Sequence, residues 1–427
     1  MARQDEASRA TAGGWGEISG YQWWILFVAW LGWVFDSMDS TLFAVVLHPS
    51  LQELLGSSAN RETIGYYGGL TLSVFLVGWA LGGVVFGVLT DYIGRARVLI
   101  FTILLYSLFT GLSALSHSWR ELAVYRFLTA LGIGGEWAAG AALVAETWPE
   151  SRRALAAGFL QSAWAFGFFL TATINLAFGQ YGWRVLFLFG IAPSLCALLV
   201  RMAVKEPQRW ERVREAIKQK ITLRELFTPA LLRSTLVGSA LAFVAVFGLW
   251  GATNWTPALV QDLLSARGEL PAAVARSTSY ALIALNFGAV LGYLSFAPIA
   301  QRMGRRAAFC LMFAGSFLFL QVTFYAPRDF QTLLYLLPVL GFFNNGVFSG
   351  FPIYFPELFP TRVRGTGCGF CFNTGRVLAA GGPLATGWLI FFMGSYTRAV
   401  SIVSLIYLFG MLVLIPAPET RGKALLD

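Results

Sequence analysis

Four ionisable side chains interrupt long apolar stretches of this sequence: Asp36, Asp39, Glu136 and Arg376. A charge at the centre of a bilayer costs about 3 kcal/mol or more, so such groups are candidates for function. Asp36 and Asp39 are three residues apart and would share one helix face. Because neighbouring carboxylates away from water repel each other, such a pair can bind and release a proton. We predict that Asp36, Asp39 and Glu136 carry a proton. The alternative is a permanently charged aspartate pair tied to Arg376 or Arg126.

Arg376 has the chemistry of an anion anchor. A guanidinium stays protonated and can hold a carboxylate through two hydrogen bonds. Without substrate, we expect Arg376 to pair with an aspartate of the first span or with Glu136. A substrate carboxylate would compete for the arginine, and the displaced acid would then take up a proton, which couples the two cargoes. The alternative is a structural salt bridge between two helix bundles.

Neutral polar residues inside apolar stretches supply further candidates for a binding site. An asparagine in a membrane span is often only an interhelical hydrogen bond, so each candidate has a structural alternative. Tryptophan could line an apolar part of the same pocket. The candidates for substrate contact are Gln161, Asn254, Asn344, Asn345 and Trp33.

The elements that position these residues are predicted to be membrane-spanning helices. The chain is 57% hydrophobic and 12% charged, whereas soluble domains are about 25% charged. Its apolar runs repeatedly exceed the roughly 18 residues of a membrane-spanning helix. An all-α polytopic membrane protein is therefore predicted. Its twelve spans lie near residues 21–47, 64–89, 98–115, 122–146, 154–178, 184–204, 233–260, 277–300, 307–325, 331–355, 365–393 and 398–416.

The twelve spans divide into two sets of six, joined by a polar segment. Lys and Arg concentrate on one side of the predicted spans, which places both termini in the cytoplasm and explains the net charge of +9 without nucleic acid. No cleaved signal and no disulfide or metal site are expected. The predicted parts are a tail (1–20), an N-terminal bundle (21–204), a linker (205–232), a C-terminal bundle (233–416) and a second tail (417–427).

Two motifs repeat at nearly one offset. GVLTDYIGRAR begins at Gly87 and returns as APIAQRMGRRA from Ala297, an offset of 297 − 87 = 210 residues. ETWPESRR begins at Glu146 and returns as ELFPTRVR from Glu357, an offset of 357 − 146 = 211 residues. Two motifs at one spacing indicate a duplicated half, which is the construction of many secondary transporters.

The first copy of the loop motif has a physical logic. Gly87 allows close helix approach, and Gly94 permits a tight turn. Arg95 and Arg97 hold the loop in the cytoplasm. Asp91 is expected beside the positive N-terminal ends of neighbouring helices, where a carboxylate is favoured.

These motifs resemble those of the major facilitator superfamily. Its signature loop reads here as Gly87, Asp91, Gly94, Arg95 and Arg97. The segment RFLTALGIGGEW is similar to the second signature, in the fourth span. The resemblance implies a latch that shuts the cytoplasmic side. Further latch residues implied by it are Arg126 and the pairs Glu146/Arg153 and Glu357/Arg364, each spaced by seven.

The resemblance also implies an arrangement and a mechanism. Two six-helix bundles would rock about a central site lined by spans 1, 4, 7 and 10, which favours Asn254 and either Asn344 or Asn345 as contacts. Gln301 stands at the position equivalent to Asp91, so a weaker latch is expected in the second half.

Within the superfamily, the sequence is most similar to metabolite:proton symporters of the aromatic-acid, sialate and lactate type. The segment DSMD in the first span and GIGGEWAAGAALVAETWPE in the fourth carry this similarity, although Ser37 replaces the usual glycine. EPQRW and PETRGK look like the ends of the sixth and twelfth spans of sugar porters. The polar residues that sugar porters carry in span seven are absent.

We therefore predict proton-coupled uptake of a small organic anion, a monocarboxylate, by alternating access in a bacterial inner membrane. The proton is the coupling ion, no cofactor is expected, and one chain is the functional unit. The alternatives are a sugar or polyol carrier and a drug:proton antiporter. An enzyme is not expected, because no nucleophile with a base, metal cluster or phosphate loop is found.

Overall fold

The computed structural model describes residues 18–426 except 60, 151, 196–198, 201–203, 208–209, 212–222, 254–255, 266, 270, 326–328, 380 and 394. Every regular element in these residues is a helix. This is the arrangement that a bilayer requires, because a helix satisfies its own backbone hydrogen bonds. The predicted N-terminal tail and the middle of the predicted linker fall outside the described residues.

The N-terminal group consists of helices that follow one another through short turns. Two of them begin at serine caps: the backbone N–H of Gln22 donates to Ser19 Oγ at 3.3 Å, and that of Glu121 donates to Ser118 Oγ at 3.2 Å. The helices are α2 (Gly20–Leu55), α3 (Arg61–Ile93), α4 (Arg95–Ser113), α5 (Trp119–Thr147), α6 (Arg153–Phe178) and α7 (Trp183–Leu188).

The C-terminal group repeats this plan with more broken helices. A 3₁₀ turn (Val347–Ser349) joins α14 to α15. The helices are α10 (Pro229–Gly251), α11 (Thr256–Ser265), α12 (Pro271–Met303), α13 (Arg305–Tyr325), α14 (Phe330–Gly346), α15 (Gly350–Leu358), α16 (Arg364–Ala379), α17 (Gly381–Met393), α18 (Tyr396–Ser404) and α19 (Ile406–Val413).

The predicted all-α polytopic fold is confirmed. Among the described residues, nine helical stretches are long and apolar enough to cross a membrane, and they correspond to predicted spans one to five and seven to ten. The three remaining predicted spans coincide with shorter helices. Span six begins with α7, span eleven is divided into α16 and α17, and span twelve is divided into α18 and α19.

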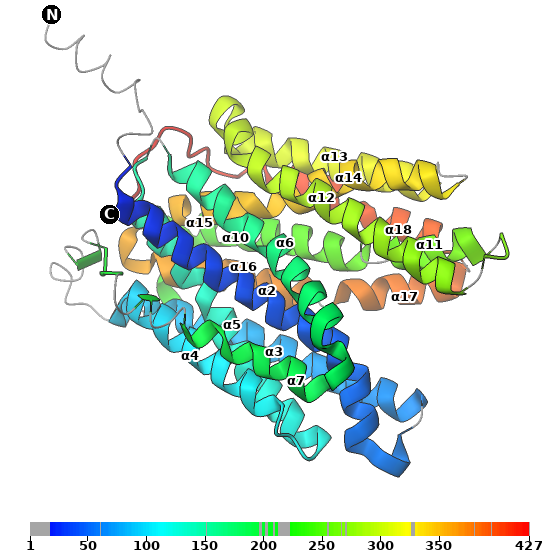
Figure 1. Ribbon diagram of the computed structural model, residues 1–427. Coiled ribbons are helices and arrows are strands. Elements are labelled where there is room, and N and C mark those ends of the chain that lie inside the picture. Colours follow the sequence, from blue (N-terminus) through cyan, green and yellow to red (C-terminus); the bar gives the residue numbers. More distant parts are fainter. Residues whose placement is uncertain are drawn as a thin grey trace, which may run out of the picture.

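The described chain begins and ends on the same side of the molecule. Gln22 Nε2 donates to the Thr147 carbonyl at 2.9 Å, and neighbouring Glu146 accepts from Arg364 at 2.8 Å. Arg364 in turn donates to the Leu426 carbonyl at 2.8 Å. We call this end of the molecule the termini side. In Figure 1 the two helix groups lie against each other near it and diverge toward the opposite side.

The two groups meet chiefly where α3 packs on α16 and α6 packs on α12. The first contact is a glycine seam, formed by Gly83 and Gly87 on α3 with Gly365 and Gly369 on α16. A β-carbon added to Gly87 would lie 3.0 Å from the Gly365 carbonyl oxygen and 3.3 Å from the Gly369 Cα. The close approach predicted at Gly87 is present, and it brings the two halves together on the termini side.

Candidate functional site

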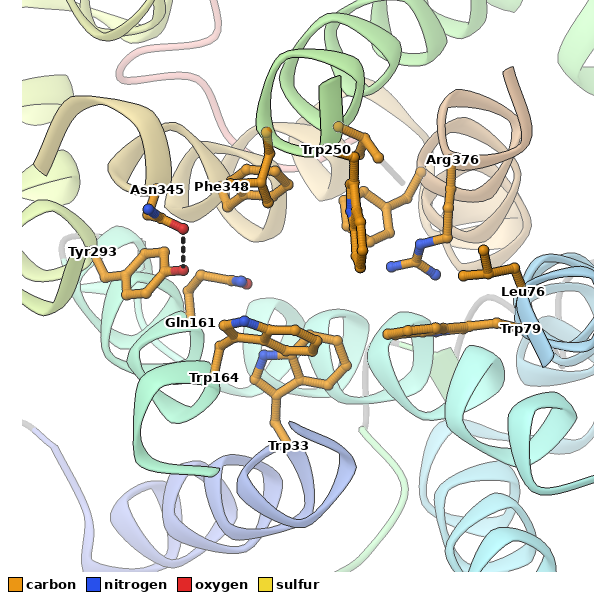
Figure 2. A pocket seen from close by; sticks show the side chains of 13 residues that line it. Trp33, Leu76, Trp79, Gln161, Trp164, Trp250, Tyr293, Asn345, Phe348 and Arg376 are labelled. Atoms are coloured by element: carbon orange, nitrogen blue, oxygen red, sulfur yellow. Dashed lines mark hydrogen bonds between the residues drawn. The ribbon is translucent and has the colours of Figure 1, made fainter. Parts of the chain in front are cut away.

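A central cavity lies between the two groups, above the glycine seam. Figure 2 shows its lining as flat aromatic rings with one guanidinium at one end and amide and phenol groups at the other. Trp33, Gln161, Asn345 and Arg376, which the sequence singled out, all line it. The other lining residues are Leu76, Trp79, Trp164, Val246, Leu249, Trp250, Tyr293, Phe348 and Phe372.

Arg376 projects from α16 and lies over aromatic rings. Its guanidinium carbon is 4.0 Å from the centre of the Trp79 ring and 4.7 Å from that of Phe372. Nη1 donates to the Asn373 side chain, one turn earlier, at 2.9 Å. The predicted resting ion pair with an aspartate or with Glu136 is wrong: among the described residues, no carboxylate lies within salt-bridge distance of Arg376.

The two aspartates of α2 have different partners. Asp39 forms a salt bridge with Arg126 of α5 and accepts from the Thr110 hydroxyl at 2.6 Å. Asp36 instead lies beside Glu136: the two buried carboxyl groups interact, and their oxygens have no hydrogen-bond partner among the described residues. Asp36 and Asp39 are therefore not the paired acids predicted from their spacing. Each of the two aspartates faces a different side chain of α5.

Glu136 fits a notch on α2. A β-carbon added to Gly32 would overlap the Glu136 carboxylate, so only glycine leaves space for it. The Tyr106 side chain of α4 lies close to the Glu136 carboxyl group. Both Asp36 and Glu136 are buried, at 0% and 2% exposure. The structure thus brings together one acid from α2 and one from α5, next to the cavity wall formed by Trp33.

Arg126 does not belong to the termini-side latch, and that assignment is wrong. It precedes Glu146 on α5 by 146 − 126 = 20 residues, which corresponds to about 30 Å of helix. Besides Asp39, its guanidinium faces the rings of Phe43 and Phe75 at 4.6 and 5.2 Å. It therefore acts inside the N-terminal group.

The neutral polar candidates separate into three cases. Gln161 and Asn345 line the cavity, where the Tyr293 hydroxyl donates to Asn345 Oδ1 at 3.4 Å (Figure 2). Asn344 lies outside the lining: it is buried and donates to the Tyr407 hydroxyl at 2.5 Å. Adjacent helix residues point about 100° apart, so only one of the two asparagines can face the cavity. Asn254 lies outside the described residues.

Sequence reasoning missed most of the aromatic lining. Trp79 carried a usable signal, because Trp79, Gly83, Gly87 and Asp91 are spaced by four and share one face of α3. Trp164 follows Gln161 by three on α6, so it shares the face of a residue already selected. Tyr293, Phe348 and the aliphatic lining residues carry no comparable spacing signal.

Asp91 joins the two groups at the termini side. Its carboxylate accepts the backbone N–H groups of Gly365 and Thr366 at 3.1 and 2.7 Å, and the Thr366 hydroxyl at 2.7 Å. These are the first residues of α16, so Asp91 lies at a helix N-terminus, as predicted. It also forms an ion pair with Arg95 at 3.1 Å.

Glu146 accepts an arginine from each group. Arg95 Nη2 lies 2.9 Å from Glu146 Oε1, and Arg364 Nη1 lies 2.8 Å from the same atom. The predicted pairings Glu146/Arg153 and Glu357/Arg364 are wrong. Each pair spans a helix break, so its two members do not share a helix face. Arg153 lies 3.5 Å from Glu150, and Glu357 pairs with Arg305 at 2.8 Å.

The turns at the repeated loop motif are capped by two acids that the sequence analysis had not assigned. Gly94 adopts φ = 114°, a conformation suited to glycine, at the start of α4. Glu206 accepts the backbone N–H groups of Arg95 and Arg97 at 2.7 and 3.1 Å. The Arg97 residue itself is exposed. These contacts give the EPQRW segment a structural role at the loop.

In the second half, Glu419 of the PETRGK segment caps the turn of the repeated loop motif. It accepts the N–H groups of Arg305 and Arg306 at 3.0 and 3.1 Å, beside the turn at Gly304. Partial burial works to raise the pKa of Glu419, but these and other backbone donors outweigh it and hold the pKa below its ordinary value. Gln301 stands where the first half has Asp91, so this position has no carboxylate that could bind a helix of the other group. The Arg305–Glu357 ion pair lies inside the C-terminal group.

Comparison with known proteins agrees with this geometry. The Major Facilitator Superfamily family model matches residues 29–296. A probable 4-methylmuconolactone transporter of Cupriavidus pinatubonensis is 32% identical over 92% of this chain and 90% of its own. A sialic acid transporter of Escherichia coli is 30% identical over 93% and 94%, and a cis,cis-muconate transport protein of Acinetobacter baylyi is 31% identical over 87% and 89%.

A solved structure shares the fold. A proton:xylose symporter bound to a bromodeoxyglucose superposes with a TM-score of 0.75 at 18% identity, covering 95% of this chain and 98% of the other. At that identity the likeness concerns the fold alone. Together with the family match and the relatives, it shows that the chain belongs to the major facilitator superfamily and is a multi-pass membrane transporter, not an enzyme.

Proposed function

We propose that this protein is a proton-coupled symporter that takes up a small organic monocarboxylate by alternating access. One observation carries the proposal. Arg376, the one cation among the residues that line the cavity, has no ion-paired carboxylate among the described residues, while a buried pair of acids, Asp36 and Glu136, lies in the opposite helix group. We place the termini side in the cytoplasm of a bacterial inner membrane.

The substrate supplies the anion that Arg376 lacks. A guanidinium removed from water is stabilised most by a carboxylate that it can hold through two hydrogen bonds. Trp79 and Phe372 compensate part of its desolvation but supply no negative charge. A small acid entering the cavity would complete this site, whereas a lipophilic cation would be repelled by it.

The acid pair is the proton site of this proposal. Two carboxylates buried side by side repel each other, so the Asp36–Glu136 pair favours a state in which one of the two carries a proton. Asp36 and Arg376 also interact electrostatically. When a substrate carboxylate neutralises Arg376, this interaction weakens and the protonated form of Asp36 is favoured. Substrate and proton therefore bind more tightly together than separately.

The lining selects the shape of the acid. Trp33, Trp79, Trp164 and Trp250 present flat apolar surfaces, which suit a planar unsaturated or aromatic body. The polar group formed by Gln161, Asn345 and Tyr293 faces the end away from Arg376 (Figure 2). The names of two relatives given above include cis,cis-muconate and 4-methylmuconolactone.

A sugar or polyol carrier is the second candidate. The polar end at Gln161 and Asn345 favours it, since neutral amides and a phenol can bind hydroxyl groups. A sugar would leave Arg376 without an anion in the loaded cavity. We therefore rank the carboxylate first. We propose a single chain as the functional unit.

Proteoliposomes containing a pH-sensitive dye test this proposal. Purified protein is challenged with benzoate, benzamide, a sugar and a polyol while internal pH is recorded. We expect acidification faster than in protein-free liposomes with benzoate only, because neutral benzoic acid also crosses a bilayer unaided. Arg376→Gln should weaken benzoate binding by about 10- to 100-fold, the cost of a lost charged hydrogen-bond pair. Arg97→Gln, which alters an exposed arginine, is the control. Proton-coupled uptake of the sugar instead of benzoate would reverse the ranking.

A further inference from the structure

The contact between Arg376 and Trp79 crosses from one helix group to the other. Arg376 belongs to α16 of the C-terminal group, and Trp79 belongs to α3 of the N-terminal group. The guanidinium carbon lies 4.0 Å from the Trp79 ring centre, which is well within cation–π range. Trp79 is buried, at 5% exposure, while Arg376 is half-buried at the cavity.

This contact is the last of a row along one helix pair. Trp79, Gly83, Gly87 and Asp91 follow one another every four residues on α3, and each meets α16. From the termini side upward, Asp91 holds the start of α16, the glycine seam follows, and the Trp79–Arg376 contact closes the row at the cavity. Figure 2 shows Trp79 beneath the Arg376 guanidinium.

Asn373 ties Arg376 to the seam below it. Its Nδ2 donates to the Gly369 carbonyl at 2.9 Å, and its Oδ1 accepts from Arg376 Nη1 at 2.9 Å. A β-carbon added to Gly83 would overlap the Asn373 side chain, so the amide is packed directly on the backbone of α3. A guanidinium that turns toward a ligand must leave both Trp79 and Asn373.

We propose that Trp79 is the resting partner of Arg376 and a positioning residue for the transport cycle. In the empty carrier the pair clamps the two helix groups at the cavity end of the seam. A substrate carboxylate competes with Trp79 for the same guanidinium, so that loading the cavity releases the clamp and favours opening of the termini side. This inference rests on the proposed role of Arg376 as carboxylate anchor.

The size of the effect follows from the strength of such contacts. Cation–π pairs, from exposed to desolvated ones, correspond to a change of about 2- to 30-fold in an equilibrium constant. Breaking the clamp should therefore raise the ratio of open to closed termini sides by about this factor. In the wild-type protein the clamp should lower the apparent affinity for substrate by the same factor, because the substrate carboxylate must displace Trp79 from Arg376.

Distance measurements between two spin labels test the inference in the full-length protein. Ile93 and Met303 are 42% and 48% exposed and lie at the termini-side ends of α3 and α12. Both are changed to cysteine for labelling, after Cys196 and Cys310 are replaced by alanine. The open-to-closed ratio is then measured without ligand, with benzoate and with its neutral analogue benzamide.

A double-mutant cycle separates the clamp from ordinary packing. Trp79→Leu and Arg376→Gln should each raise the open ratio by about 2- to 30-fold, while Trp79→Phe, which keeps an aromatic face, should raise it less. In the Arg376→Gln background, Trp79→Leu should have no further effect. Trp137 is the matched control, since its ring stacks on Phe372 of α16 at 4.4 Å. Any effect of Trp137→Leu should persist in that background.

Each result has one meaning. An unchanged ratio in Trp79→Leu, or an equal increase with and without Arg376, overturns the clamp. If the cycle shows coupling and benzoate binds calorimetrically without raising the open ratio, competition between carboxylate and Trp79 is rejected. If benzoate does not bind at all, the proposed carboxylate function fails, while the ligand-free cycle still decides whether the clamp exists.

Discussion

At the scale of single residues, the surroundings of the two α2 aspartates set their chemistry apart. Asp39 faces Arg126 and the Thr110 hydroxyl, which together stabilise a fixed negative charge. Asp36 faces the carboxyl group of Glu136, a partner that repels it unless a proton is shared. The same residue type, three positions along one helix, therefore provides one structural anion and one proposed proton site.

Asp36→Asn should uncouple transport from the proton. An amide has nearly the size of the carboxyl group but cannot release a proton at physiological pH. We expect benzoate-driven acidification of proteoliposomes to be lost, while exchange of labelled for unlabelled benzoate continues. Glu136→Gln is the companion variant and should behave alike. Full acidification in both variants would remove this pair from the coupling mechanism.

Asp39→Asn should instead destabilise the protein. The change leaves the Arg126 guanidinium buried without its carboxylate, which typically costs about 3–5 kcal/mol. Thermal unfolding followed by tryptophan fluorescence should show a clear fall in the melting temperature. Thr110→Val is the matched control, since it removes one hydrogen bond to Asp39 and should cost about 1 kcal/mol. Equal melting temperatures for Asp39→Asn and wild type would contradict a structural ion pair.

At the scale of helices, the pairing of α3 with α16 is set by residue size. Gly83, Gly87, Gly365 and Gly369 let the two backbones touch, and Asp91 then reaches the start of α16. Small residues are the usual means of close helix contact in a membrane, where no hydrophobic force draws helices together. The glycine seam thus requires residues without side chains. The contact of Asp91 with the start of α16 in turn requires the close approach that the seam allows.

Gly87→Val should open the seam. A β-carbon at this position would lie 3.0 Å from the Gly365 carbonyl oxygen, and valine adds two further methyl groups. Overpacking costs typically 1–3 kcal/mol, so we expect the open-to-closed ratio of the spin-labelled protein to rise by about 5- to 150-fold. Gly87→Ala should give a smaller shift. Gly381→Ala, where nothing lies within 4 Å of an added β-carbon, should give none.

Glu419 makes the loop turn of the second half dependent on pH. Its pKa is lowered in the folded protein, so the stability that it contributes is present above the ordinary carboxyl pKa and is lost as pH falls through the folded pKa. Glu419→Gln should therefore lower the melting temperature at neutral pH, and the difference from wild type should shrink in acid. A constant difference from pH 7 to pH 3 would argue against the charged cap.

At the scale of the whole molecule, the sequence predicted where the helices lie but not which side chains pair with one another. Hydropathy located the membrane helices, and the repeated loop located Asp91 at a helix N-terminus. Partner choice could not be predicted, because it depends on helix rotation and on which side of a helix break a residue falls. Rotation separates Asn345 from Asn344, and breaks separate Glu146 from Arg153.

The repeated motif carries a glutamate in each half, but the two glutamates form ion pairs with different partners. Glu146 bridges Arg95 of its own half and Arg364 of the other. Its counterpart Glu357, offset by 357 − 146 = 211 residues, pairs with Arg305 inside one half. The duplicated motif is therefore used once across the interface and once within a bundle, which concentrates control of the termini side on one acid.

Glu146→Gln should release the termini side. The change leaves Arg364 buried without a salt-bridge partner among the described residues, whereas Arg95 keeps Asp91 at 3.1 Å. Because the lost ion pair exists only when the two groups touch, its cost falls on the closed state, and the open-to-closed ratio between the labels at positions 93 and 303 should rise at least tenfold.

Glu357→Gln is the matched control for Glu146→Gln. It breaks a buried ion pair of similar length, 2.8 Å, but inside the C-terminal group. Glu357→Gln should lower the melting temperature of the protein, because the ion pair is present in both the open and the closed state. The label distances should change only weakly, since Arg153 of the other group reaches Glu357 only through longer-range electrostatics. Equal shifts in the label distances for both variants would show that the latch depends on total buried charge and not on the bridge between the halves.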